Sequence, residues 1–238
     1  MKPMYTCDLN IHGVRLRIKA RQQEKIHQLE SLCSLFLLPA ESESRVETEW
    51  TDEDEVDILS LLARHDIFAF HAAAYVNING KGILLPGKAA SGKTTIAFSA
   101  LTSGYPFVGD DVVLCRRDSN DFRLLPFKSY LFLKHGEESE KYYVSEHYPE
   151  DVFCTTYARV IVFPQIVSEE ESVITKNSDM RAVLTGLLRT SIWVRDNDSR
   201  GRQASILEEL CMLPAYNLFL GNDHKRRPQL AIELLDRI

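Results

Sequence analysis

The sequence lacks the features that mark disulfide-rich, zinc-binding and membrane-spanning proteins. No two cysteines form a C-x-x-C pair, so we expect reduced thiols and neither a disulfide framework nor a zinc site. No apolar run approaches the length of a transmembrane helix, and the start of the chain has no signal-peptide pattern. We therefore expect a soluble, cytoplasmic protein with no membrane partner. The scattered cysteines are Cys7, Cys33, Cys115, Cys154 and Cys211.

An excess of positive charge is also missing. The chain has 28 Lys and Arg against 34 Asp and Glu, a net charge of −6. This balance argues against a nucleic-acid partner, because phosphate backbones are held mainly by Lys and Arg. Internal repeats and low-complexity tracts are absent as well. With 238 residues, 45% of them hydrophobic, the chain fits a small α+β N-terminal region over residues 1–65 and a larger domain over residues 66–238.

What the sequence does contain is a complete phosphate-binding loop. Residues 87–94 read GKAASGKT and match G-x-x-x-x-G-K-[ST] at every fixed position. A short apolar run, Ile83–Leu85, predicts a buried strand before the loop. A helix is predicted after it from Thr95 to Leu101, with Gly104 at its C-terminal cap. A chance glycine turn is the alternative, but the full octet in the order strand, loop, helix favours a nucleotide-phosphate site.

The fixed positions of the loop have separate physical roles. The two glycines allow backbone conformations in which successive N–H groups surround phosphate oxygens, at the positive end of the helix dipole. The lysine supplies a charge for the β- and γ-phosphates of ATP, and the threonine hydroxyl is placed to bind Mg²⁺. The residues expected to bind the nucleotide are Gly87, Lys88, Ala89, Ala90, Ser91, Gly92, Lys93, Thr94 and Thr95.

A pair of carboxylates follows one helix and one strand later. The strand is predicted over Tyr105 to Val108 and leads into Gly109-Asp110-Asp111. Ligands of open α/β sheets bind beyond the carboxyl ends of the strands, so both carboxylates are expected near the phosphates. At such a centre one carboxylate can hold the metal and the other can take a proton from an attacking hydroxyl. The alternative is a plain Asp-Asp turn.

These segments, together with His71-Ala72-Ala73-Ala74, resemble the catalytic core of HPr kinase/phosphorylase, which phosphoenolpyruvate carboxykinase shares. The resemblance covers residues 70–111 and implies an α/β fold with a P-loop-containing mixed β-sheet. It also implies an ATP-dependent kinase that phosphorylates a hydroxyl, with Asp110 as the base, Lys93 and His71 at the transferred phosphoryl, and Thr94 and Asp111 at Mg²⁺. Residues 66–238 would form this kinase-like domain, and related kinases commonly assemble, which suggests a homo-oligomer.

The sequence departs from that family in two ways. HPr kinases usually have an acidic residue after the loop Ser or Thr, where this chain has Thr95, and their second glycine- and arginine-rich signature has no clear match. The expected acceptor is therefore a serine of a protein or peptide, or a small hydroxylated molecule, and not HPr itself. A nucleotide-binding regulatory module with little phosphotransfer is the main alternative. An NTP hydrolase ranks last, since the N/T-K-x-D guanine signature is absent.

The rest of the chain is predicted from hydrophobic periodicity and turn residues. The N-terminal predictions are a hairpin over Tyr5 to Ala20, a helix over Gln22 to Leu38, a short strand at Val46 to Trp50 and a helix from Asp52 capped by Thr51. Later predictions are a strand over Phe68 to Asn77, a hairpin turn at Asn79-Gly80, a strand at Arg159 to Phe163 closed by Pro164, and a helix from Ser178-Asp179 to Leu188.

Three features are left open at this stage. Residues His135 to Asp151 are polar and rich in tyrosine, and we interpret them as a mobile lid or acceptor-binding loop. The segment Arg195 to Arg202 is a charged loop whose three arginines could stabilise phosphate charge or simply contact solvent. Lys128 is either a phosphate or acceptor contact or a surface charge.

Overall fold

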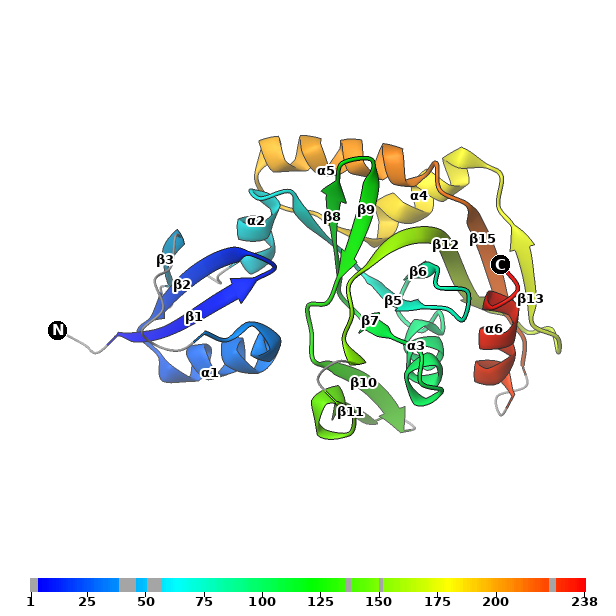
Figure 1. Ribbon diagram of the computed structural model, residues 1–238, viewed down its shortest axis with the longest axis horizontal. Coiled ribbons are helices and arrows are strands. Elements are labelled where there is room, and N and C mark those ends of the chain that lie inside the picture. Colours follow the sequence, from blue (N-terminus) through cyan, green and yellow to red (C-terminus); the bar gives the residue numbers. More distant parts are fainter. Residues whose placement is uncertain (1–3, 39–45, 51–56, 136–137, 150–151, 223–225) are drawn as a thin grey trace.

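The computed structural model describes residues 4–38, 46–50, 57–135, 138–149, 152–222 and 226–238, with the side chains of residues 46–50, 134–135 and 138 left aside. It is a mixed α/β structure, as predicted (Figure 1). A large mixed sheet forms the centre, helices cover both of its faces, and a small α+β region lies at one end. Among the described residues no helix is long and apolar enough to cross a lipid bilayer.

The N-terminal region is a three-stranded sheet with helices beside it. The tight turn at His12 and Gly13, with φ angles of 51° and 91°, matches the right-handed twist of the strands it joins. The predicted hairpin is thus confirmed. The first helix is shorter than predicted and continues only as one 3-10 turn. The elements are β1 (Tyr5–Ile11), β2 (Val14–Ala20), α1 (Gln23–Leu32), the 3-10 turn Ser34–Phe36, β3 (Val46–Trp50) and α2 (Ile58–Ala63).

The second helix, α2, begins at Ile58 in the described part of the chain. Asp57 is its N-cap and accepts a hydrogen bond from the Ser60 N–H at 3.0 Å. The proposed cap Thr51 and start Asp52 lie outside the described residues, as does most of the acidic run before them.

The central sheet has the strand order β14-β4-β8-β9-β12-β6-β5-β7, and β15 pairs with both β12 and β13. The 11-residue strand β12 joins the two halves, because it pairs in turn with β9, β6 and β15. The strands are β4 (Ile67–Phe70), β5 (Ala72–Val76), β6 (Gly82–Pro86), β7 (Phe107–Gly109), β8 (Val113–Asp118), β9 (Asp121–Leu125), β12 (Thr156–Ile166), β13 (Val173–Lys176), β14 (Ser191–Ile192) and β15 (Ala215–Leu220).

Four helices lie against this sheet. Helix α4 begins at the predicted cap Asp179, whose carboxylate accepts from the N–H groups of Arg181 and Ala182. Helix α3 ends as predicted, with Gly104 at a φ of 81° just beyond it. In Figure 1, α4 and α5 cover one face, while α3 and α6 lie on the other. Their bounds are α3 (Lys93–Thr102), α4 (Met180–Thr190), α5 (Asn197–Leu210) and α6 (Arg227–Leu235).

Three predictions about the later chain are wrong. Pro164 does not close a strand but lies within β12. Strand β6 pairs with β12 only as far as Ile161, so the nitrogen of Pro164 points to an edge of β12 that has no partner strand among the described residues. Residues Arg195 to Arg202 are not a loop, because α5 begins at Asn197 with Asp196 as its cap. The described part of His135–Asp151 is mainly strand β11 (Glu138–Tyr143), which forms a hairpin with β10 (Tyr130–His135), followed by a 3-10 turn at Val144–Glu146.

Alternation along β4 and β5 shows how the sheet is covered. Phe68, Phe70, Ala72 and Ala74 all join the hydrophobic cluster under α4 and α5. Of the residues between them, Ile67 and Ala69 face a cluster built with the N-terminal region, whereas Ala73 and Tyr75 face the cluster under α3 and α6. The second face of the sheet therefore has two separate covers. Their junction falls at residue 71.

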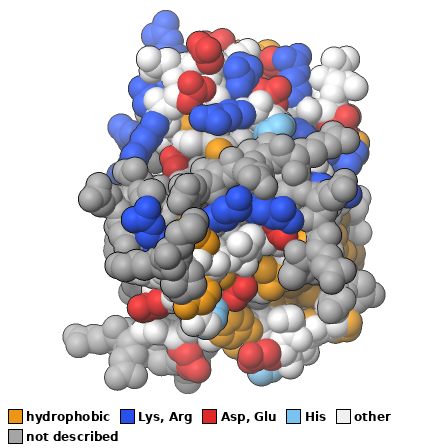
Figure 2. Space-filling view, turned by 90° about the vertical axis from the view of Figure 1, so that its left-hand side faces the viewer, with side chains coloured by type: hydrophobic (Ala, Val, Ile, Leu, Met, Phe, Trp, Pro, Cys, Tyr) orange, Lys and Arg blue, Asp and Glu red, His pale blue; other side chains and the backbone are white. Residues whose placement is uncertain are grey.

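Figure 2 shows the end of the molecule that carries the N-terminal region. Basic and acidic side chains are intermixed in its upper part, and hydrophobic side chains gather lower down. The five cysteines are free thiols, as predicted, and four of them are buried. Burial raises the pKa of Cys7, Cys33 and Cys115 to about 12, which keeps these thiols protonated and unreactive.

Candidate functional site: the phosphate loop and a carboxylate pair

The predicted phosphate loop joins β6 to α3 and is shaped by left-handed backbone positions. Ala90 and Gly92 have φ angles of 61° and 99°, and Gly92 is the N-cap of α3. A Cβ on Gly92 would lie 2.5 Å from Leu220 Cδ1, and one on Gly87 would lie 2.5 Å from Ser91 Oγ. Gly92 is therefore favoured both by its left-handed backbone and by the space around it, whereas at Gly87 only the close approach of Ser91 disfavours a side chain.

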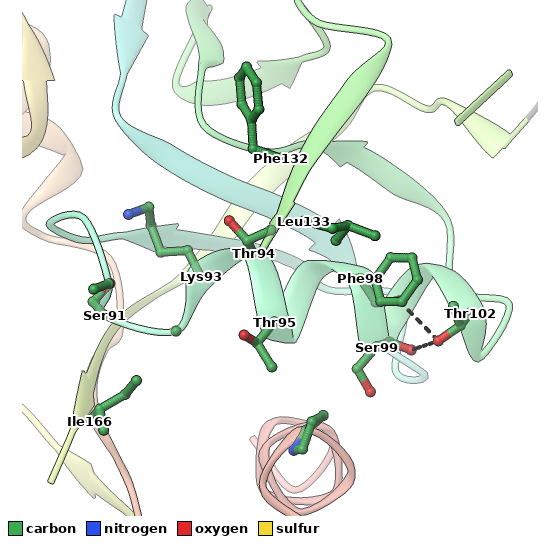
Figure 3. Close-up of a pocket in the computed structure, with 13 residues that line it drawn as sticks. Ser91, Lys93, Thr94, Thr95, Phe98, Ser99, Thr102, Phe132, Leu133 and Ile166 are labelled. Atoms are coloured by element: carbon green, nitrogen blue, oxygen red, sulfur yellow. Dashed lines mark hydrogen bonds between the residues drawn. The ribbon is translucent and has the colours of Figure 1, made fainter. Parts of the chain in front are cut away.

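A cavity of about 580 Å³ opens beside this loop. Residues 90–95 form one wall, and apolar side chains from α3, β10, β12 and α6 form the others (Figure 3). Its volume and mixed lining are those of a small-molecule site. Gly87, Lys88 and Ala89 do not line it, although all three were predicted to bind the nucleotide. The other lining residues are Phe98, Ser99, Thr102, Phe132, Leu133, Ile166 and Pro228.

Lys93 lies in the first turn of α3 with its side chain folded against the loop. Its Nζ donates to the carbonyl oxygens of Gly87 and Lys88, both at 2.7 Å. Only 5% of the residue is exposed. Burial lowers its pKa, and the carboxylates of Asp110 and Asp111 oppose that shift. The sequence-predicted lysine and carboxylates are thus close enough to interact electrostatically.

Asp110 is the most unusual group of the site. It is 1% exposed, and neither carboxylate oxygen has a hydrogen-bond partner among the described residues. Burial raises its pKa, and the nearby Thr94 hydroxyl, Asp111 backbone and Lys93 ammonium oppose that shift. A buried carboxylate without a donor destabilises the folded chain. Such a group is typical of a site that is built for function.

Asp111 occupies a strained turn and is held by two cationic or polar side chains. Its φ is 65°, and the Val112 N–H donates to the Asp110 carbonyl at 2.8 Å to close a three-residue turn. The Oδ1 atom lies 3.1 Å from His71 Nδ1, and Oδ2 contacts Lys128 Nζ. Lys128 thus contacts the predicted site, a role that the sequence left undecided.

His71 lies between β4 and β5, where a single continuous strand was predicted. That prediction is wrong because the chain bends at His71. The His71 N–H donates to the Thr190 carbonyl at 2.7 Å, next to the pairing of β4 with β14, and the His71 carbonyl accepts from the Gly87 N–H at 3.4 Å, next to the pairing of β5 with β6. Nδ1 also lies 3.0 Å from the Asp111 carbonyl oxygen. By the alternation described above, residue 71 faces the junction between the two covers of the sheet. The bend therefore brings the imidazole to the carboxylate pair.

The arginines of residues 195–202 do not approach the phosphate loop. Arg200 donates to the Val194 carbonyl, and Arg202 donates to Asp66 and to the Ala63 carbonyl. Both therefore hold α5 to neighbouring segments. Arg195 is exposed and lines a different cavity. In the part of the chain that the structure describes, no group of three or more His, Cys, Asp or Glu side chains is arranged to hold a metal ion.

Sequence reasoning did not identify the apolar walls of the cavity beside the phosphate loop. Phe98 was visible as a large side chain one turn beyond Thr94, but it reads equally well as a core residue of the helix. Phe132, Ile166 and Pro228 come from segments 30 or more residues away in the chain. Only the packing of β10, β12 and α6 around α3 brings them together.

Comparison with known proteins gives little beyond the fold. No protein-family model matches the sequence, and no curated protein matches it. Among solved structures, the chain is similar to the HPr(Ser) kinase/phosphatase from Coxiella burnetii, with 14% sequence identity and a TM-score of 0.45. The match covers 71% of this chain and 94% of that one. This is a distant likeness at the level of the fold, so the function must be inferred from the residues of the site.

Proposed function

We propose that this chain is an ATP-dependent kinase that transfers the γ-phosphate to a hydroxyl, and that this hydroxyl belongs to a serine of a protein or peptide. The observation that carries the proposal is the position of Asp110. A carboxylate that is buried and has no well-formed hydrogen bond among the described residues lies beside a complete phosphate loop and within electrostatic reach of its lysine. That is the arrangement expected of a base acting on a hydroxyl next to a bound triphosphate.

In this proposal, each group of the site has a separate role in phosphate binding or in proton transfer. Loop N–H groups and the start of α3 bind the phosphate oxygens, and Lys93 exchanges its two carbonyl partners for the β- and γ-phosphates. Asp110 accepts the proton of the acceptor hydroxyl. At the same time the hydroxyl oxygen forms a bond to the γ-phosphorus, and the bond between the γ-phosphorus and the oxygen of the β-phosphate breaks, which releases ADP. Its raised pKa makes it a better proton acceptor than an exposed aspartate.

Thr94 and Asp111 would hold Mg²⁺, as the motif and the family resemblance imply. Hydroxyl and carboxylate oxygens are the ligands it prefers, and when bound it neutralises charge on the phosphates. Asp111 would have to release Lys128 to bind a metal, which leaves that ammonium free to approach the transferred group. His71, 3.1 Å from Asp111 Oδ1, orients that carboxylate. A cytoplasmic location, where ATP is available, and a homo-oligomer remain predictions.

Transfer from γ-labelled ATP to a fixed-serine peptide library tests the proposal. We expect Lys93→Ala to lose both ATP binding, measured by calorimetry, and transfer. Asp110→Asn should keep ATP binding while transfer falls about 10²–10⁴-fold. The control is Lys176→Ala, which removes an exposed lysine on β13. Lys176 pairs with Tyr216, at the end of β15 opposite to Leu220. This variant should change neither ATP binding nor transfer.

Each contrary result points to a different function. Unchanged transfer in Lys93→Ala or Asp110→Asn contradicts the assigned roles. MgATP binding without transfer to any acceptor identifies the alternative, a nucleotide-binding regulatory module. Rapid ATP turnover without an acceptor identifies a hydrolase.

A further inference from the structure

A second cavity lies next to the carboxylate pair and shares no lining residue with the nucleotide cavity. Its volume is about 650 Å³. It is walled on one side by α1 and α2 of the N-terminal region and on the other by residues that flank β8, β9 and β14. The lining residues are Gln28, Leu29, Leu32, Asp57, Ile58, Leu59, Val112, Phe127, Lys128, Ile192, Trp193 and Arg195.

This cavity is joined to the proposed site by two of its lining residues. Val112 directly follows Asp111, and Lys128 contacts the Asp111 carboxylate while also lining the cavity. The nucleotide cavity is lined by Lys93 and Thr94, which interact with Asp110 from the other cover of the sheet. The carboxylate pair therefore contacts residues of both cavities. A molecule in the second cavity would therefore lie next to Asp111, through Val112 and Lys128, and would leave the nucleotide cavity free.

The lining indicates what kind of molecule fits. Two thirds of the lining side chains are apolar, including Phe127 and the 39% exposed Trp193. Two of the polar ones are already engaged, since Asp57 caps α2 through Ser60 and Lys128 pairs with Asp111. A sugar or other polyol would leave its hydroxyl groups without partners here. An apolar side chain would gain by being buried.

The positive charge of Arg195 lies at the wall of this cavity. Arg195 has no hydrogen-bond or ion-pair partner among the described residues, and it follows Trp193 by two positions at the cavity wall. Its guanidinium presents a planar set of donors that suits a carboxylate. The cavity thus combines an apolar wall, a basic edge and a connection to the base.

We propose that the second cavity binds the acceptor of the kinase, and that this acceptor is a serine-bearing peptide segment with a bulky apolar residue and an acidic residue close to the serine. This proposal rests on the proposed function. The apolar residue packs against Phe127 and Trp193, and the acidic residue pairs with Arg195. The serine hydroxyl then faces Asp110, which takes its proton as the γ-phosphate is transferred.

Transfer to a peptide library measures this preference. The full chain is incubated with Mg²⁺, γ-labelled ATP and peptides with a fixed serine and three randomised positions on each side. We expect about 10- to 100-fold more incorporation with a bulky apolar neighbour than with glycine. At one position an acidic residue should exceed lysine about tenfold. Arg195→Glu should reverse that charge preference, Arg195→Lys should largely keep it, and the exposed control Arg181→Glu should not alter it.

A binding measurement does not depend on phosphotransfer. The chain has two tryptophans, so a Trp50→Phe variant leaves Trp193 as the sole fluorescent reporter of the cavity. The probe is acetyl-Gly-Leu-Phe-Ser-Glu-Gly amide, with a control in which glycines replace Leu and Phe and lysine replaces Glu. We expect the probe, but not the control, to shift the emission of Trp193 to shorter wavelength with saturation. Arg195→Glu should weaken this binding about tenfold, and replacing Glu by lysine in the probe should restore it.

The outcomes separate this proposal from the proposed function. A flat library profile, or a profile that Arg195→Glu leaves unchanged, overturns the acceptor cavity while the kinase stands. Saturable probe binding with the expected charge swap, in a chain that transfers no phosphate, supports the peptide site and rejects the kinase. Failure of the probe to change Trp193 fluorescence, together with transfer to a small hydroxylated molecule that Arg195→Glu does not affect, also overturns it.

Discussion

Asp110 and Asp111 are neighbours in the sequence but lie in opposite environments. Asp110 is buried with no hydrogen-bond donor among the described residues, whereas the carboxylate of Asp111 is about one third exposed and interacts with His71 and Lys128. The turn at Asp111, with its φ of 65°, separates the two. The sequence predicted two carboxylates near the phosphates. It did not reveal which of them would be desolvated, because that depends on the strands around the turn.

The burial of Asp110 predicts a pH-dependent cost in stability. Because its folded pKa is raised, the unfolded chain loses the proton first as pH increases, and the free energy of unfolding falls until the folded group also ionises. Asp110→Asn removes this penalty. We expect the variant to gain about 1–3 kcal/mol at pH 8, or about 2–4 °C of Tm per kcal/mol, and little at pH 4.

Thermal unfolding of both proteins between pH 4 and pH 8 measures this difference. The exposed Glu208→Gln serves as the control, with no gain that grows with pH. A variant that is less stable than the parent at pH 8 would show that the Asp110 carboxylate has a stabilising partner. We expect Asp110→Asn to gain stability and to lose transfer together, because a group that serves the function of a site often destabilises the folded protein.

At the scale of elements, the phosphate loop depends on how α3 meets β15. Gly92 caps α3 in a left-handed conformation, and its Cα faces Leu220 at the end of β15. The loop motif predicted a flexible glycine at this position. The contact with Leu220 adds a second, steric requirement that the motif does not contain, since β15 is more than 120 residues later in the chain.

We therefore expect Gly92→Ala to lower both stability and nucleotide affinity. Its φ of 99° and a Cβ only 2.5 Å from Leu220 Cδ1 should cost about 1–3 kcal/mol, and ATP affinity should fall by more than about tenfold. The matched control is Gly104→Ala, at a φ of 81° with no atom within 4 Å of the added Cβ. It should lose about 1–2 kcal/mol of stability and keep its ATP affinity.

Thermal unfolding and calorimetry with MgATP measure the two effects separately. Equal loss of ATP affinity in both variants would show that the loop responds to general destabilisation. Full affinity in Gly92→Ala would show that Leu220 yields to the added methyl group.

At the scale of the whole molecule, the N-terminal region shares one hydrophobic cluster with the larger domain. Cluster residues of β1, β2 and α1 pack with Ile67, Ala69, Leu114 and Phe127 of the larger domain. Hydrogen bonds also cross this boundary, between Ser34 and Ser129 at 2.7 Å and between His12 Nε2 and the Pro126 carbonyl at 2.7 Å. The division into residues 1–65 and 66–238 stays a prediction, and the shared cluster argues that the two parts are not independent.

A fragment of residues 66–238 tests that coupling. Without the N-terminal region, Ile67, Ala69, Leu114 and Phe127 would face solvent as one apolar patch. We expect the fragment to aggregate or to bind a hydrophobic dye without a cooperative thermal transition, while the full chain prepared in parallel unfolds in one transition. A fragment that unfolds cooperatively and binds ATP like the full chain would instead establish residues 66–238 as an autonomous domain.

The local features of this protein follow from the sequence alone. The phosphate loop, its flanking strand and helix, the hairpin turns at His12-Gly13 and Asn79-Gly80 and the Asp179 cap are all set by residues close together in the chain. Each depends on a backbone conformation or a capping hydrogen bond that a few neighbouring residues determine. Pattern and spacing were therefore sufficient to predict them, together with the α/β class.

Only the tertiary structure decided how these pieces form a site. The bend at His71 and the pairing of Lys128 with Asp111 arise from contacts between different segments of the chain. The two cavities on either side of the carboxylate pair exist because α3 with α6 covers one part of the sheet and the N-terminal region covers another. Burial and long-range packing, which no local pattern encodes, set the charge state of Asp110 and the chemistry within its reach.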